Sequence, residues 1–128
     1  MTAYDCGVAS IPERVLVVGL ARSGRAAVAA LRRVGAAVVA YDTDPGIDTS
    51  EIDAKVARGR WSPALLDGVG LVVKSPGVPG EASPIVTARY ARLRVISEIE
   101  LGARLLPNPL IGVTGTNGKT TTTALLGA

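Results

Sequence analysis

The feature that most constrains the fold is a short apolar run, Val15-Leu16-Val17-Val18, which ends in Gly19 and is followed by a helical pattern. A β-branched run without polar alternation is typical of a strand buried on both faces, as in a parallel sheet. Ser23 to Val34 places apolar residues on one helical face and arginines on the other, and Gly35 is suited to end that helix. A second strand is predicted over 37–41, so the first 42 residues form one strand–helix–strand unit.

The same alternation of strands and helices continues along the chain. Residues 45–67 are less regular, and we expect a short helix there with a short connection around Trp61. Ser97 is a suitable amino-terminal cap for the helix that follows it. The remaining predicted elements are strands over 70–74 and 94–96 and helices over 84–92 and 97–106. This order predicts an α/β fold, a Rossmann-like open parallel sheet with helices on both faces.

Pro107-Asn108-Pro109 is the strongest domain-boundary signal in the sequence, because these prolines stop the preceding helix. We therefore predict a first domain over residues 1–107 and the start of a second domain over 108–128. The second part would hold one strand, at 110–113, and a glycine-rich loop.

Composition narrows the possible function classes. An apolar fraction of 48% in 128 residues supports one domain with a core. The net charge is +3 and the arginines are scattered, whereas a nucleic-acid surface needs a dense basic stripe. Cys6 is the only cysteine, so no intrachain disulfide can form. Residues 1–10 lack signal-peptide features and no apolar run reaches the about 20 residues of a membrane span, so we expect a cytoplasmic chain without membrane insertion.

The glycine-rich loop after the predicted strand at 110–113 carries the strongest chemical signal. Its backbone N–H groups and the positive end of the following helix suit the phosphates of a nucleotide triphosphate. Lys119 would add a full charge, and Thr120 could reach Mg²⁺. Val113 departs from the strict P-loop pattern, which has glycine at that position. The predicted nucleotide-binding residues are Gly115, Thr116, Asn117, Gly118, Lys119, Thr120 and Thr121.

Three predicted strands end in residues that suit a ligand, and a parallel sheet gathers such ends at one edge. Residues 19–24 resemble a dinucleotide-binding turn with Ala21 in place of the middle glycine; this turn either holds a phosphate or is only structural. Asp42 follows the second strand, where it either contacts a ribose or caps a turn. Ser75-Pro76-Gly77 follows the strand at 70–74, and by physics alone it is a turn.

Taken together, these segments resemble the Mur ligases, the ATP-dependent amino-acid ligases of peptidoglycan synthesis. Gly115 to Thr120 matches the family's phosphate loop, Gly-Thr-Asn-Gly-Lys-Thr, residue for residue, which accounts for Val113. The upstream resemblance rests on Gly19-Leu20 with Ser23-Gly24, Asp42-Thr43, Ser75-Pro76-Gly77 and Glu98-Ile99-Glu100-Leu101. It covers residues 15–128 in order and spacing.

The resemblance implies a first domain that binds the UDP part of a sugar-nucleotide substrate. By position, Arg22 and Ser23 would lie at the diphosphate, and Asp42 and Thr43 near the uridine. The residues implied to lie beside the substrate are Ser75, Pro76 and Gly77. The most similar family member often has a basic residue after its Asp-Thr pair, whereas this chain has Asp44, and we expect Arg22 to compensate.

The reaction implied by the resemblance joins D-glutamate to UDP-N-acetylmuramoyl-L-alanine, with ATP and Mg²⁺. The γ-phosphoryl group passes to the L-alanyl carboxylate, and the D-glutamate amine then attacks the acyl phosphate. Residues 115–121 would bind ATP, with Lys119 as the catalytic residue that offsets charge on the phosphoryl group and Thr120 at the metal. The resemblance further implies that the chain is an amino-terminal fragment, because the family's remaining metal ligands and its glutamate-binding domain lie further downstream. The fragment is expected to be a monomer without ligase activity of its own.

Other readings of the same residues stay open. A nicotinamide-dinucleotide oxidoreductase domain would use Asp42 and the glycine turn, but it has no need of the phosphate loop. A non-catalytic module that senses UDP-sugars is a third hypothesis. Within the resemblance, other Mur ligases and folylpolyglutamate synthase have related loops.

Overall fold

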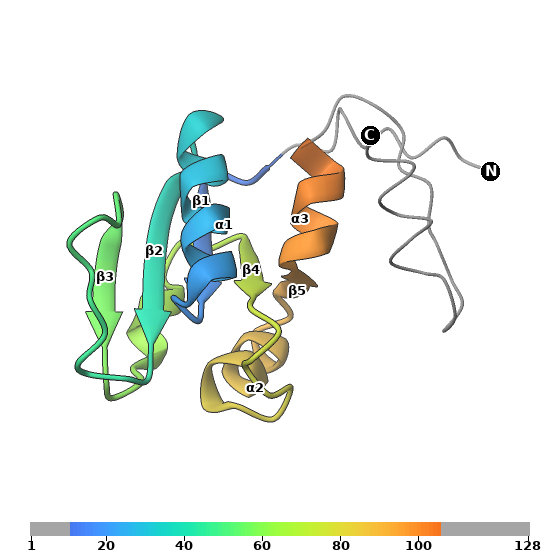
Figure 1. Ribbon diagram of the computed structural model, residues 1–128. Coiled ribbons are helices and arrows are strands. Elements are labelled where there is room, and N and C mark those ends of the chain that lie inside the picture. Colours follow the sequence, from blue (N-terminus) through green and yellow to red (C-terminus); the bar gives the residue numbers. More distant parts are fainter. Residues whose placement is uncertain (1–10, 106–128) are drawn as a thin grey trace, which may run out of the picture.

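The computed structural model describes residues 11–105, which fold into one five-stranded sheet with helices on both faces (Figure 1). The elements in chain order are β1 (Arg14–Val18), α1 (Arg22–Arg33), β2 (Ala37–Asp42), β3 (Lys55–Arg58), the 3₁₀ helix η1 (Pro63–Leu66), β4 (Leu71–Lys74), α2 (Ser83–Tyr90), β5 (Arg94–Ser97) and α3 (Glu98–Leu105). The predicted boundary at Pro107, the strand at 110–113 and the glycine-rich loop lie outside the described residues.

Strand β1 lies at the centre of the sheet, whose order is β3-β2-β1-β4-β5 with every neighbouring pair parallel. Val15 pairs with Val38 of β2 on one side and with Leu71 of β4 on the other. The strands therefore end at the same edge, called here the carboxyl edge (Figure 1). The strand order reverses between β1 and β4, and open parallel sheets bind ligands beyond such a point.

Side chains of β1 alternate between two apolar cores, one on each face of the sheet. Val15 and Val17 pack with Val28 and Leu31 of α1 and with Leu101 of α3. On the opposite face, the second core brings β1 against α2 and η1. This second core contains Leu16, Val18, Val39, Tyr41, Val69, Val72, Ile85 and Ala88. Burial on both faces explains why β1 is continuously apolar.

The predicted elements within the described residues are confirmed, to within a few residues at their ends. Gly35 has a φ of 85° directly after α1, as expected of a residue that ends a helix. Ser97 Oγ accepts the Glu100 N–H at 3.1 Å, which confirms the cap before α3. Helix η1 lies in the region where a short helix was expected.

Strand β3 is the element that the sequence does not predict. Its residues Lys55-Val56-Ala57-Arg58 place only two small apolar side chains between two cations. Pairing with β2, from Val39 to Asp42, stabilises this extended segment. The strand is therefore determined by its neighbour rather than by its own pattern.

Both outer strands of the sheet, β3 and β5, are four residues long. Lys55 and Arg58 are exposed at the two ends of β3, and Arg94 is exposed at the start of β5. The apolar content of the sheet is thus concentrated in its three inner strands, β1, β2 and β4.

Candidate functional site

The turn after β1 packs closely against the turn after β4 and against the first turn of α1. Gly19 has a φ of 92°, and a Cβ there would lie 2.8 Å from Val78 Cγ2. A Cβ on Gly24 would lie 1.7 Å from the Gly19 carbonyl oxygen. Both positions therefore require glycine, one for its conformation and both for the close approach of their neighbours.

The peptide group between Gly19 and Leu20 is held by side chains from both neighbouring strand ends. The Leu20 N–H donates to Asp42 Oδ2 at 2.7 Å, from the end of β2. The Ser75 hydroxyl, just after β4, donates to the Gly19 carbonyl oxygen at 2.9 Å. The three strand ends singled out from the sequence thus meet at one peptide group.

Helix α1 starts directly after this turn, and no side chain among residues 11–105 caps its first N–H groups. Ala21 is its amino-terminal cap, and its methyl group cannot accept a bond from the helix N–H groups. No acidic residue lies in the first turn. The Arg25 N–H is bonded to Ala21 O at 3.0 Å, whereas the N–H groups of residues 22–24 precede the first intrahelical bond. Arg22 is exposed and Ser23 partly exposed beside them. Such a helix start favours an anion.

Asp42 is a structural residue of this edge. Besides the bond to Leu20, its Oδ1 accepts the Asp44 N–H at 2.8 Å. Each carboxylate oxygen has a second lone pair, so Asp42 can still accept a bond from a ligand. Thr43 beside it is exposed. The turn role of Asp42 is therefore visible in the structure, and its contact with a ribose stays a prediction.

Tyr41, the residue before Asp42, is 1% exposed. Its hydroxyl donates to Gly59 O, and its ring makes an edge-to-face contact with Trp61 at a centroid distance of 5.1 Å. Burial and, to a lesser extent, the neighbouring Asp42 charge raise the pKa of the Tyr41 hydroxyl above its ordinary value of 10.0. Tyr41 is therefore neutral at physiological pH and anchors the end of β2.

The turn after β4 contains one buried residue and two exposed ones. Ser75 is 4% exposed and its hydroxyl is used inside the protein, whereas Pro76 and Gly77 are exposed. Lys74 Nζ donates to Val78 O at 2.7 Å and to Ser75 O at 3.3 Å, which ties both ends of this turn together. Only the exposed part of the turn can touch a ligand directly.

Sequence reasoning missed two residues at this edge, Lys74 and Arg25. Arg25 Nε donates to Leu20 O at 3.0 Å, and its Nη2 donates to Asp48 O in the loop after β2. The Ser50 N–H bond lowers the pKa of Asp48. A signal existed for Lys74, a cation at the end of an apolar strand, but Arg25 reads as one of several exposed helix arginines.

A shallow groove of about 240 Å³ runs between α1 and α3 on one face of the sheet. Ser23 and Glu98 provide its polar lining, and alanines, leucines and Gly102 of the two helices provide the rest. Glu98 Oε2 is buried without a hydrogen-bond partner among the described residues. The groove therefore adjoins the start of α1 but does not contain the strand-end turns.

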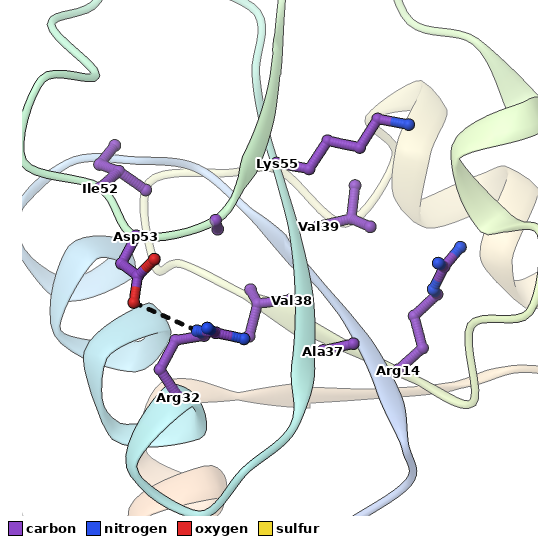
Figure 2. Close-up of a pocket in the computed structure, with 9 residues that line it drawn as sticks. Arg14, Arg32, Ala37, Val38, Val39, Ile52, Asp53 and Lys55 are labelled. Carbon is purple, nitrogen blue, oxygen red and sulfur yellow. Dashed lines mark hydrogen bonds and ion pairs between the residues drawn. The ribbon is translucent and has the colours of Figure 1, made fainter.

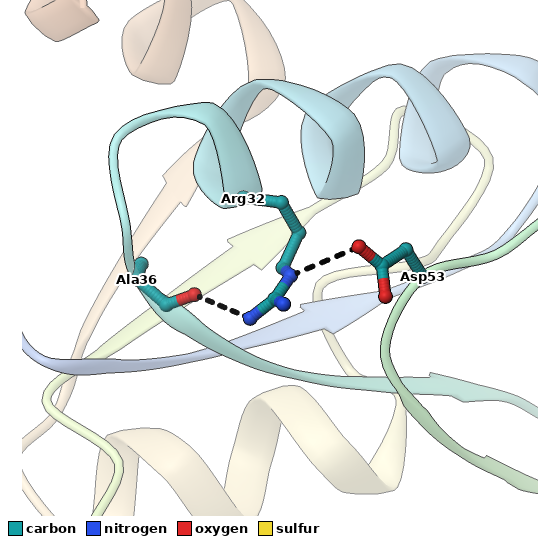
Figure 3. A network of polar contacts seen from close by, with 3 residues as sticks. All are labelled: Arg32, Ala36 and Asp53. Atoms are coloured by element: carbon teal, nitrogen blue, oxygen red, sulfur yellow. Dashed lines mark hydrogen bonds and ion pairs between the residues drawn. The ribbon is translucent and has the colours of Figure 1, made fainter.

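A larger cavity, of about 420 Å³, lies at the opposite, amino-terminal edge of the sheet, around the start of β2 (Figure 2). Arg14, Arg32 and Lys55 bring cations to it, with Asp53 as the acid. Arg32 Nε contacts Asp53 Oδ2 at 3.3 Å and its Nη1 donates to Ala36 O at 3.3 Å (Figure 3). These side chains are exposed, and no predicted site residue lines this cavity.

Within residues 11–105, no three His, Cys, Asp or Glu side chains lie together in a way that could hold a metal ion. No helix in that range has the length and apolar character to cross a bilayer. The predicted ATP and Mg²⁺ residues, 115–121, lie outside the described part of the chain.

Comparison with known proteins identifies relatives of this domain. A family described as "Mur ligase MurD-like, N-terminal domain" matches residues 13–97. The UDP-N-acetylmuramoylalanine–D-glutamate ligase of Myxococcus xanthus is 47% identical over 123 residues, which cover 90% of this chain and 27% of the relative. The enzymes of the same name from Solibacter usitatus and Citrifermentans bemidjiense are 44% and 39% identical, over 89% and 90% of this chain and 26% and 27% of their own lengths.

A solved structure, that of a pseudomurein peptide ligase type C from Methanothermus fervidus, superposes with a TM-score of 0.62 at 21% identity. The match covers 90% of this chain and 25% of that structure, and it shows the shared fold. The chain thus spans about a quarter of the length of the proteins that it matches.

Proposed function

Because the chain belongs to the Mur ligase family, as a MurD-like N-terminal domain, we propose that its carboxyl edge binds the uridine diphosphate part of a sugar nucleotide. One observation supports this most directly. The ends of β1, β2 and β4 are joined at the Gly19–Leu20 peptide group, directly ahead of an α1 start that has no side-chain cap. A diphosphate suits such a helix start, because it accepts N–H bonds and interacts favourably with the helix dipole.

The individual contacts are assigned from position along this edge. Arg22 and Ser23, in the first turn of α1, would contact the diphosphate. Asp42 and Thr43 would lie near the uridine, with Asp42 accepting a bond through its remaining lone pairs. The turn after β4 would lie beside the substrate through its exposed residues Pro76 and Gly77, while Ser75 supports it from inside.

The charge balance at this edge supports a role for Arg22. Asp44, exposed after the Asp-Thr pair, adds a negative charge where a basic residue often occurs in the family. Arg22 is exposed at the start of α1 and forms no ion pair with the described residues. Its guanidinium would offset the diphosphate charge.

For the whole enzyme, we propose the reaction in the relatives' name, the joining of D-glutamate to UDP-N-acetylmuramoyl-L-alanine in the cytoplasm during peptidoglycan synthesis. Residues 1–107 would form the UDP-binding domain and residues 108–128 would begin an ATP-binding domain. In that second part Gly115 to Thr121 would bind ATP, with Lys119 at the phosphates and Thr120 near Mg²⁺. The chain covers about a quarter of the relatives, so the ligase reaction is assigned to the full-length protein.

Calorimetric titration of the chain with UDP, uridine and NAD tests the nucleotide site. We expect UDP to bind more tightly than uridine, because of its phosphates, and more tightly than NAD. NAD is the competing ligand because Asp42 follows β2, where dinucleotide-binding domains place a ribose contact. Tighter binding of NAD than of UDP would contradict the proposed function.

A pair of arginine variants sharpens the same experiment. Arg22→Ala should weaken UDP binding about tenfold and leave uridine binding unchanged, since a charged hydrogen bond to phosphate is lost. Arg33→Ala is the matched control, because Arg33 is exposed in the last turn of the same helix. Equal effects of the two variants on UDP binding would show that only overall charge is involved.

A further inference from the structure

We propose that Ser75 and Arg25 are positioning residues that turn the carbonyl groups of the β1 turn away from the bound anion. The inference rests on the proposed function, since it concerns the same phosphate-binding turn. It assigns to Ser75 a role inside the protein rather than a contact with the substrate. It also assigns a role to Arg25, which lies outside the set of implied substrate contacts.

First, Ser75 holds the Gly19 carbonyl group inside the protein. The carbonyl oxygen accepts the Ser75 hydroxyl at 2.9 Å, across a sequence separation of 56 residues. Ser75 is 4% exposed, so this bond lies in the interior and a ligand cannot reach the hydroxyl. The same oxygen lies where a Cβ on Gly24 would be, which directs it under the first turn of α1.

The second step is the N–H group of the same peptide. The Leu20 N–H donates to Asp42 Oδ2 at 2.7 Å, so the peptide plane is fixed at both its donor and its acceptor. A peptide group that is bonded at both ends cannot rotate without breaking two hydrogen bonds. Ser75 and Asp42 thereby act as a pair, although they come from strands on opposite sides of β1.

The third step is the next carbonyl along the turn. Leu20 O accepts Arg25 Nε at 3.0 Å, and the same guanidinium reaches Asp48 O in the loop after β2. Arg25 thus holds this carbonyl from the helix side and connects it to the β2–β3 loop. Arg25 has a planar fork of donors, which Lys lacks, so it can serve both carbonyls at once.

Both carbonyl oxygens that precede Ala21 are therefore engaged by protein donors. Carbonyl oxygens facing a phosphate would repel it, whereas N–H groups attract it. With Gly19 O and Leu20 O held in this way, the N–H groups at residues 22–24 are the polar backbone groups left to face an anion. Preorganisation of this kind lowers the cost of ordering the turn when a ligand binds.

The test uses Ser75→Ala and Arg25→Lys in the 128-residue chain, with two measurements. The first is calorimetric affinity for UDP and for uridine. The second is NMR-detected hydrogen exchange of the Leu20 amide without ligand. We expect the ratio of UDP to uridine affinity to fall about tenfold in Ser75→Ala, with a smaller fall in Arg25→Lys, and the Leu20 amide to exchange about tenfold faster in Ser75→Ala.

Thr87→Ala is the control, because it also removes a hydroxyl that donates to a backbone carbonyl, Ser83 O at 2.6 Å, but on α2. The same hydroxyl accepts the Trp61 Nε1–H at 3.2 Å, so this variant loses at least as many hydrogen bonds as Ser75→Ala. It should change neither the affinity ratio nor the Leu20 exchange rate. Equal effects of Thr87→Ala and Ser75→Ala would overturn the positioning role, as would an unchanged Leu20 exchange rate in Ser75→Ala. Equal affinity of the unmodified chain for UDP and uridine would instead contradict the proposed function, while the exchange measurement still decides the positioning role.

Discussion

The two edges of the sheet differ: one has a cavity lined by exposed charges, and the other has a turn fixed by hydrogen bonds. The amino-terminal edge has the larger cavity, about 420 Å³, with cations that are exposed and loosely paired. At the carboxyl edge, bonds of 2.7 and 2.9 Å from the ends of two neighbouring strands fix one peptide group. Exposed ion pairs hold side chains weakly, whereas buried and partly buried hydrogen bonds between distant segments hold the backbone.

This difference indicates where the sheet is prepared for a ligand. At the carboxyl edge, we expect a substitution of Gly19, Gly24, Ser75 or Asp42 to change the backbone of the turn. At the amino-terminal edge, Arg32 and Asp53 could change with little effect on the backbone.

The largest effect is expected at Gly24. Gly24→Ala would place a Cβ 1.7 Å from the Gly19 carbonyl oxygen, which must move. We expect a loss of about 3 kcal/mol in the free energy of unfolding, measured by urea denaturation, and no measurable UDP binding. Gly102→Ala in α3 is the control, because nothing lies within 4 Å of its added Cβ. It should be neutral or stabilise by about 0.5–1 kcal/mol, and equal effects at the two glycines would contradict the tight turn.

A smaller effect is expected at Asp42. Asp42→Ala removes the acceptor of two backbone N–H groups, those of Leu20 and Asp44, and should cost about 1–3 kcal/mol of unfolding free energy. Asp42→Asn keeps one acceptor oxygen and should cost less. Urea denaturation of both variants measures the difference. A neutral Asp42→Ala would show that this carboxylate does not hold the turn.

A third prediction concerns pH, through Tyr41. Its pKa is raised by burial and by Asp42, so the folded state keeps the proton longer than the unfolded state. The resulting stability is complete below the ordinary pKa of 10.0 and is lost as pH rises through the raised pKa. Tyr41→Phe should therefore flatten the alkaline decline in melting temperature. Tyr90→Phe, at a side chain that is 86% exposed, should leave the decline unchanged.

The smallest effect is expected at the amino-terminal edge. Arg32 and Asp53 are 44% and 82% exposed, so a double-mutant cycle of Arg32→Ala and Asp53→Ala should give a coupling energy below about 0.5 kcal/mol. UDP affinity should be the same in both variants as in the unmodified chain. Weaker UDP binding in either variant would move the ligand site toward the larger cavity and remove the contrast between the edges.

Much of the fold could be predicted because local pattern and tertiary environment agree. The apolar run at 15–18 is buried on both faces, and Gly35 adopts the positive φ that ends a helix. Strand β3 could not be predicted, because Val56 and Ala57 alone give a weak signal and pairing with β2 decides their conformation.

The location of the candidate site was also predictable, since parallel topology brings strand ends together whatever their side chains do. The hydrogen-bond partner of each side chain at this edge could not be predicted. Ser75 reads as an exposed turn residue in sequence, and only the packing of β4 beside β1 turns its hydroxyl inward to Gly19. Arg25 lies five residues after Leu20, whose carbonyl it holds. No sequence pattern predicts this contact.

The short outer strands have a consequence for association between copies of this chain. An edge strand offers unpaired backbone groups to another strand, and long apolar edges invite aggregation. Strand β3 offers only four residues, with the cations Lys55 and Arg58 at its ends. Two copies that met along β3 would bring these like charges together, so this edge disfavours pairing between one molecule and the next.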